Sequence, residues 1–413
     1  MNELTVFFLA FLAIGTGLQL WLTRRHRAYV AEHQKAVPEA FAEKIPLDAH
    51  QKAATYTLTK TGFGQKMLMI ELVVLLLWTL GGLLNVLDEA WRSLGWSPLW
   101  TGVVVLISFD LLSKLIDLPA EVYGTFRIEA KFGFNRTTPT VFMTDLVKDI
   151  VLSLAIGIPF AALVLWLMAS AGQFWWLYVW AVSMAFLLLM LWAFPIFIAP
   201  LFNKFKPLEN EELKQRIEAL LQRNGFASQG IFVMDGSKRS GHGNAYFTGL
   251  GNSKRVVFYD TLLEGLNTDE IEAVLAHEIG HFKHKHLRKR MIVMAISSLA
   301  GLALLGWLMQ QQWFYTGLGI NTPSTYMALL LFALVLPVFT FFLAPVMAWF
   351  SRKHEFEADN FASEQGSALA LIQALVKLYR ENASTLTPDP LYSAFFHSHP
   401  PASVRIAHLS EKI

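Results

Sequence analysis

Residues 151–171, with the sequence VLSLAIGIPFAALVLWLMASA, decide the fold of this chain because they form an apolar run without a charged side chain. About 20 mainly apolar residues are needed for a helix to cross the hydrocarbon core of a bilayer. Hydrophobic residues make up 54% of the 413 residues and charged residues only 16%, which is outside the usual balance of a soluble domain. The sequence therefore predicts a mainly α membrane protein. Six further stretches qualify as spans, at roughly 4–23, 67–87, 99–118, 175–197, 291–309 and 326–349.

The first stretch, near the N-terminus, could instead be a signal peptide. It has no basic region in front of its apolar run, and Arg24, Arg25 and Arg27 follow it at once. We therefore expect an uncleaved helix and seven transmembrane helices in all.

The basic residues predict how these helices are oriented. The N-terminus and the loops 88–98, 172–174 and 310–325 together contain one basic residue, Arg92. By the positive-inside rule, the N-terminus lies outside and the large polar segments lie in the cytoplasm. The membrane would be a bacterial inner membrane, or the endoplasmic reticulum in a eukaryote. Four segments follow: helices 1–5 with their loops (1–203), a cytoplasmic insert (204–290), two helices (291–350) and a cytoplasmic C-terminal segment (351–413).

Composition also limits the chemistry. The chain has no cysteine, so any metal must be held by His, Asp or Glu side chains. A net charge of +2 is too small to suggest nucleic acid as a partner.

The motif HEIGH, residues 277–281, lies on a predicted helix that begins at Asn267. His277 and His281 are four residues apart, so their imidazoles project from one face and suit a single zinc ion. Zinc lowers the pKa of a bound water to about 7, and Glu278 would act as the general base. By itself the motif could also be a chance match on a polar surface helix.

Glu355 is the candidate for the third ligand, because the position at which a metzincin has its third His is occupied by Leu287. Two antiparallel helices of about 28 residues each separate His281 from Glu355. Because they rise and fall by the same length, Glu355 returns to the height of His281 along the membrane helices. Asp359 is one turn further on, where a carboxylate can orient a ligand His. The alternative for this acidic pair is a solvated face. We interpret His284 and His286, within the run 283–290, as a basic membrane flank rather than extra ligands.

Beyond these residues, the chain resembles the CAAX prenyl protease 1 family over nearly its whole length. The similarity lies in YGTFRIEAKFGFN (123–135), IAPLFNKF (198–205), GSKRSGHGNAYF (236–247), AVLAHEIGH (273–281), EFEAD (355–359) and HSHPP (397–401). The resemblance implies seven helices enclosing a chamber, with one zinc ion per chain at its cytoplasmic end.

The resemblance also implies roles for residues outside the HEIGH motif. Asn244, Ala245, Tyr246 and Phe247 would form a strand that pairs with the substrate backbone. His399 would help to stabilise the oxyanion, and Arg405 would line the site. From the residues alone, Asn244 would be a turn residue and His399 the end of a loop.

A small β element is expected near 230–260, where IFVMD and RVVFYD are apolar runs bounded by Gly and Ser. Asp110 and Lys114, inside a predicted span, would line the chamber or pair with each other.

The predicted function is hydrolysis of peptide bonds in prenylated C-terminal CAAX peptides or other hydrophobic peptides at the membrane. One alternative is a heat-shock-type quality-control membrane metalloprotease. An alternative of another class is a transporter or lipid-binding receptor with a structural metal, although a structural site needs a fourth protein ligand and no glutamate base.

Overall fold

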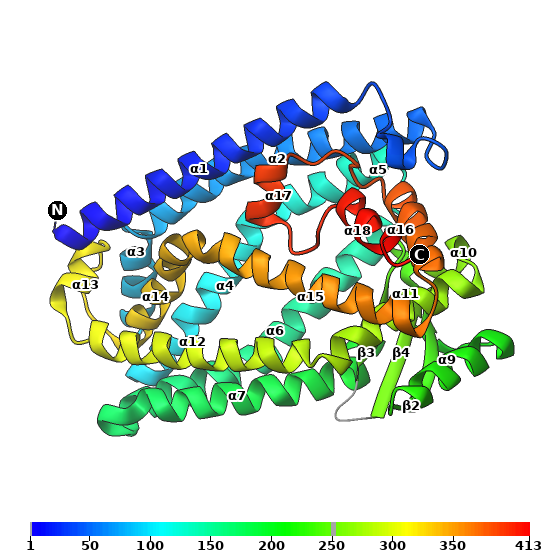
Figure 1. Cartoon of the computed structure of the whole chain (residues 1–413). Coiled ribbons are helices and arrows are strands. Elements are labelled where there is room, and N and C mark those ends of the chain that lie inside the picture. The colour runs from blue at the N-terminus through cyan, green and yellow to red at the C-terminus, as the bar shows by residue number, and fades with distance from the viewer. Residues whose placement is uncertain (1, 249–252) are drawn as a thin grey trace.

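The computed structural model describes residues 2–248 and 253–413. Among these residues, seven helical spans are long and apolar enough to cross a membrane, which confirms the predicted number. Figure 1 labels the helices of these spans. They are α1 (Glu3–His33), α2 (Leu47–Trp78), α4 (Pro98–Tyr123), α6 (Pro139–Ser170), α7 (Trp175–Ala193), α12 (His286–Leu308) and α14 (Thr325–Thr340), which continues into α15 (Ala344–Gln365).

The two largest differences from the predicted apolar stretches are in the second and the last span. Helix α2 begins 20 residues earlier than the stretch 67–87 and ends at Trp78, and residues Leu83–Arg92 form the separate helix α3. The break lies at Gly82, whose φ of +82° is a conformation that favours glycine. The last span continues past the predicted end at 349, so Glu355 lies on the same helical rod as the membrane segment.

A four-stranded sheet lies at one end of the helices, with the strand order β1-β2-β4-β3. Its strands are β1 (Phe205–Pro207), β2 (Ala227–Met234), β3 (Ala245–Thr248) and β4 (Ser253–Tyr259). Strands β2 and β4 are parallel and contain the two predicted runs, which confirms the β element. Strand β3 pairs antiparallel with β4 and, in the described part of the chain, forms an edge of the sheet.

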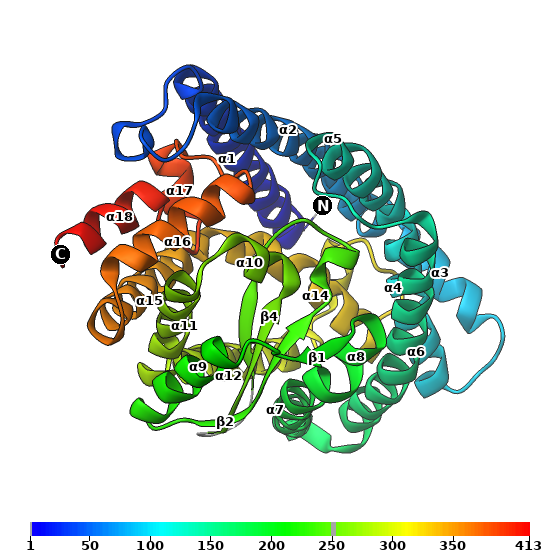
Figure 2. The same ribbon diagram turned by 90° about the vertical axis from the view of Figure 1, so that its right-hand side faces the viewer.

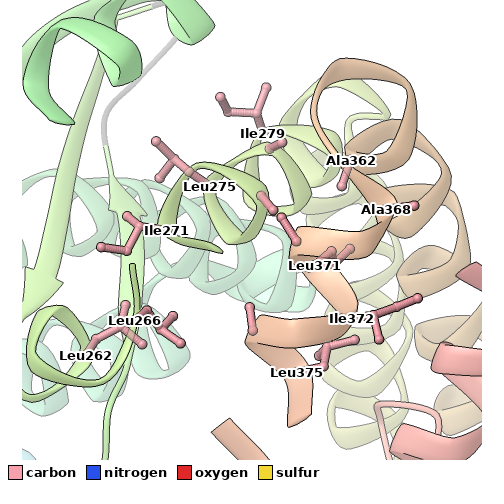
Figure 3. Close-up of a cluster of buried hydrophobic side chains, with 14 of the residues drawn as sticks. Leu262, Leu266, Ile271, Leu275, Ile279, Ala362, Ala368, Leu371, Ile372 and Leu375 are labelled. Carbon is pink, nitrogen blue, oxygen red and sulfur yellow. The ribbon is translucent and has the colours of Figure 1, made fainter. Parts of the chain in front are cut away.

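A compact apolar core holds together the part of the molecule around the sheet (Figure 3). Helix α11 (Thr268–Lys283) begins with the predicted capping box, in which the side chains of Asn267 and Glu270 each accept a backbone N–H of the other residue. Its apolar side chains Ile271, Leu275 and Ile279 belong to this core, together with residues of α16 (Ala368–Glu381) and α10 (Asp260–Gly265). Because these three residues lie on one side of the helix, the histidines of HEIGH are left on the other side.

The remaining helices connect and cover these layers. They are α5 (Ala130–Phe132), α8 (Ala199–Phe202), α9 (Glu211–Arg223), α13 (Gln312–Gly317), α17 (Pro390–Phe396) and α18 (Ala402–Ser410). Figure 2 shows α1, α2, α4, α6 and α7 in an arc around the sheet, with α11, α15 and α16 on the opposite side. Within this arrangement lie two cavities of about 820 and 900 Å³.

Candidate metal centre

His277 and His281 on α11 and Glu355 on α15 converge on one point. Their ligand atoms all lie within 4.8 Å of one another. The two Nε2 atoms are 3.2 Å apart, and the Glu355 carboxylate oxygens lie 3.5 Å from Nε2 of His277 and 3.4 Å from Nε2 of His281. The three residues named from the sequence as ligands are therefore together.

Close packing of two helices produces this convergence. A Cβ atom placed on Gly280 would lie 3.0 Å from the Cα atom and 3.1 Å from the carbonyl oxygen of Ala358. These separations are tighter than ordinary carbon contacts, so only glycine lets α11 approach the backbone of α15 this closely. Gly280 is therefore the residue of HEIGH that allows a carboxylate from α15 to reach the histidines.

The donor set fits a metal ion. Glu355 is 1% exposed, and among the described residues its Oε2 atom has no hydrogen-bond partner, although His399 Nδ1 is 2.7 Å away. A buried carboxylate oxygen without a hydrogen-bond donor is costly unless a cation completes the site. Two imidazoles and one carboxylate form a common ligand set of catalytic zinc.

A carboxylate contacts the first histidine on its Nδ1 side. Asp359 Oδ1 lies 2.8 Å from Nδ1 of His277, so it can accept the second ring proton and leave Nε2 free for a metal. Arg405 donates to both oxygens of Asp359, at 2.8 and 2.5 Å. Burial and the Arg405 guanidinium lower the pKa of His277, but the neighbouring carboxylates of Asp359 and Glu355 outweigh them and raise it above its usual value. The surroundings of this ring thus favour positive charge.

The second histidine is oriented by residues to which the sequence analysis gave no such role. Nδ1 of His281 lies 2.9 Å from Nδ1 of His286, whose Nε2 lies 2.8 Å from a carboxylate oxygen of Glu357. His286 begins the sixth membrane span, as expected of a flanking residue, but it is only 2% exposed and is buried as a partner of His281. It folds back because Lys285 adopts a positive φ of 57°, a conformation that lysine rarely adopts and that no sequence pattern signalled.

Glu278 lines the same small cavity as two of the ligands, His277 and Glu355. This cavity, of about 230 Å³, is bounded by His277, Glu278, Glu355, Asn244 and His399, among others. Ala245 and Arg405 also line it. The site therefore contains a carboxylate that is not a ligand, next to an imidazole from the HSHPP segment.

Two of the predicted substrate-binding residues lie elsewhere. Ala245 faces the metal cavity, but Tyr246 lines the 900 Å³ cavity on the other side of the strand. Phe247 packs beside the ring of Phe282, with ring centroids 5.8 Å apart. Alternation along β3 explains the position of Tyr246, because successive side chains of a strand point to opposite faces. Phe247 lies on the same face as Ala245 but further along the strand, at the ring of Phe282.

Comparisons with known proteins match this architecture. Residues 26–204 match the family model of the CAAX prenyl protease N-terminal region with five membrane helices, and residues 207–413 match peptidase family M48. The CAAX prenyl protease 1 homolog of Oryza sativa subsp. japonica is 34% identical over 94% of this chain and 92% of its own length. CAAX prenyl protease 1 of Saccharomyces cerevisiae is 39% identical over 73% of this chain and 71% of its own length.

A solved structure agrees with the family matches over the whole chain. The crystal structure of S. mikatae Ste24p has a TM-score of 0.91 at 32% identity, with 99% of both chains covered. The N-terminal match and this coverage favour neither the heat-shock-type protease nor the transporter. The chain thus belongs to peptidase family M48, to its CAAX prenyl protease 1 members, and is an integral-membrane metalloendopeptidase.

Proposed function

We propose that the protein is a zinc peptidase that cleaves prenylated C-terminal CAAX peptides, with the zinc held by His277, His281 and Glu355. The observation that carries this proposal is the convergence of these three ligands beside Glu278. The Glu278 carboxylate is not one of the ligands, so it is available for proton transfer. The names of the relatives, CAAX prenyl proteases, support the prenylated substrate.

Each side chain has a separate task in the proposed reaction. When bound, zinc supplies a Lewis acid that acidifies a water and polarises the scissile carbonyl. Glu278 accepts the proton of the attacking water and returns it to the amine that leaves when the C–N bond breaks. His399, which contacts Glu355, donates to the oxyanion. Asp359 and Arg405 hold His277 in its ligating tautomer.

The edge of the sheet is the proposed site for the substrate backbone. Strand β3 is paired with β4 on one side, and Ala245 lies on the wall of the metal cavity. An extended peptide can pair with such an edge by main-chain hydrogen bonds, with the Asn244 side chain at its end.

The cytoplasmic face of the membrane is the proposed location of the site, with the N-terminus outside. Basic residues cluster in the segments joined to the site, and Arg92 is the single basic residue on the opposite side. The four segments 1–203, 204–290, 291–350 and 351–413 would act as one unit, because the last three all contribute to the site or to its supporting helices.

Cleavage of a farnesylated CAAX peptide by protein purified in detergent tests the proposal. A chelator should abolish cleavage after the modified cysteine, and stoichiometric zinc should restore it. If zinc-loaded protein cuts only unprenylated hydrophobic peptides, the prenylated substrate is wrong while the peptidase assignment stands.

A further inference from the structure

The cavity of about 900 Å³ has an apolar lining along two membrane helices. Helix α6 contributes Leu152, Ile156 and Phe160, which lie four residues apart on one stripe. Helix α7 contributes Phe186 and Met190 from the facing side. The cavity therefore offers an elongated apolar surface parallel to the membrane helices.

This cavity faces the interior rather than the lipid. Val147 and Val151 on the opposite side of α6 are 56% and 57% exposed, as expected of a lipid-facing stripe. Asp149 and Ser153, in contrast, border the cavity, and both bind Nζ of Lys114, at 2.8 and 2.6 Å. Ionisable groups inside a membrane protein face an internal cavity rather than the hydrocarbon. The predicted pairing of Asp110 with Lys114, at 3.6 Å, belongs to the same cluster.

Strand β3 lies between this cavity and the metal cavity. Tyr246 of β3 lines it, and the preceding residue, Ala245, lines the metal cavity. Tyr259 of β4 lines both this cavity and the 820 Å³ cavity that reaches Asn244 and His399. A peptide paired with β3 would thus have the metal on one face and the apolar cavity beside the other.

We propose that the apolar cavity between α4, α6 and α7 binds the isoprenyl chain of the substrate while the peptide pairs with β3. This inference rests on the proposed function. The competing 820 Å³ cavity is lined by polar side chains such as Lys60, His242 and Asn382, which suit a peptide and not a hydrocarbon. An isoprenyl chain is long, flexible and apolar. Its binding free energy is therefore most favourable in the cavity lined by Leu152, Ile156 and Phe160, where its apolar surface is removed from water.

Gly157→Phe fills this cavity with little disturbance of the backbone. Gly157 lines the cavity, and an added Cβ would meet only the Cδ1 atom of Ile107 at 3.5 Å, an ordinary contact. The matched control is Gly64→Phe on α2, where an added Cβ meets nothing within 4 Å and which lines neither cavity.

The readout is the ratio of kcat/KM for a farnesylated peptide to kcat/KM for the same peptide without the lipid. Displacing two methylene groups from an apolar site weakens binding about tenfold, so Gly157→Phe should lower this ratio at least tenfold. Gly64→Phe should leave it unchanged. An unchanged ratio in Gly157→Phe overturns the inference, whereas a wild-type ratio near one overturns the prenyl substrate itself.

Photocrosslinking covers the case in which the filled variant does not fold. A peptide with a diazirine on its terminal isoprene unit, bound to the Glu278→Gln protein, should label α6 and α7 at Phe160 or Phe186. Labelling of Lys60 or Asn382 instead overturns the inference. The inference is also overturned if a phospholipid occupies the cavity and the farnesylated peptide does not displace it.

Discussion

Gly280→Ala should weaken the metal site without unfolding the protein. The added methyl carbon would lie 3.0 Å from Ala358 Cα and 3.2 Å from Phe361 Cβ, where ordinary carbon contacts are about 3.5–4.0 Å. Helices α11 and α15 must therefore separate by roughly half an ångström. Overpacking of this kind costs about 1–3 kcal/mol. Replacing a glycine inside a helix by alanine stabilises the helix by about 1 kcal/mol, which offsets part of this cost. The net loss of unfolding free energy is therefore about 0–2 kcal/mol.

The same displacement is large for a metal site, because ligand distances are held to about ±0.2 Å. We expect zinc affinity to fall at least tenfold, measured by competition with a chromophoric chelator in detergent. Gly64→Ala is the matched control: its Cβ would meet nothing within 4 Å, so it should leave zinc affinity unchanged. Wild-type zinc affinity in Gly280→Ala would refute the argument that close contact of these two helices sets the ligand geometry.

Three further substitutions probe the support of the site and of the fold. Asp359→Asn removes the charged acceptor of His277, so zinc affinity should fall about 10–100-fold in the same chelator competition; an unchanged value would contradict its orienting role. His286→Ala removes the partner of the second ligand histidine, and zinc affinity should again fall about tenfold or more, whereas a solvated flank would show no change. Tyr326→Phe deletes a 2.6 Å hydrogen bond to the buried Asp88 and should lower the unfolding free energy by about 1–3 kcal/mol at unchanged zinc affinity; equal stability of the two proteins in a denaturant titration would contradict this.

Much of the fold was predictable because the membrane imposes a simple length requirement. Seven apolar stretches correspond to seven spans. The ends of the spans were less predictable, since α2 and α15 continue beyond their apolar stretches as more polar helix. Hydropathy detects only the part of a helix that lies in hydrocarbon.

The ligands were predictable for a different reason. The spacing of His277 and His281 and the equal lengths of the two following helices are local quantities, and both are visible in one sequence. The contact between His281 and His286 depends on a left-handed turn at Lys285 and on packing against α15. Such tertiary features have no periodic signature. The apolar cavity beside Tyr246 was equally hidden, because it is assembled from three membrane spans and the end of a sheet.

Glu278→Gln tests the central claim most directly, since it removes a base while keeping the size of the side chain and all three ligands. Zinc content and single-turnover cleavage of the farnesylated peptide are measured on the same purified samples. We expect one zinc ion per chain in both proteins and a loss of cleavage of at least 100-fold in the variant, the usual scale of general acid–base catalysis. Wild-type cleavage by zinc-loaded Glu278→Gln would contradict the assignment of this centre as the catalytic site.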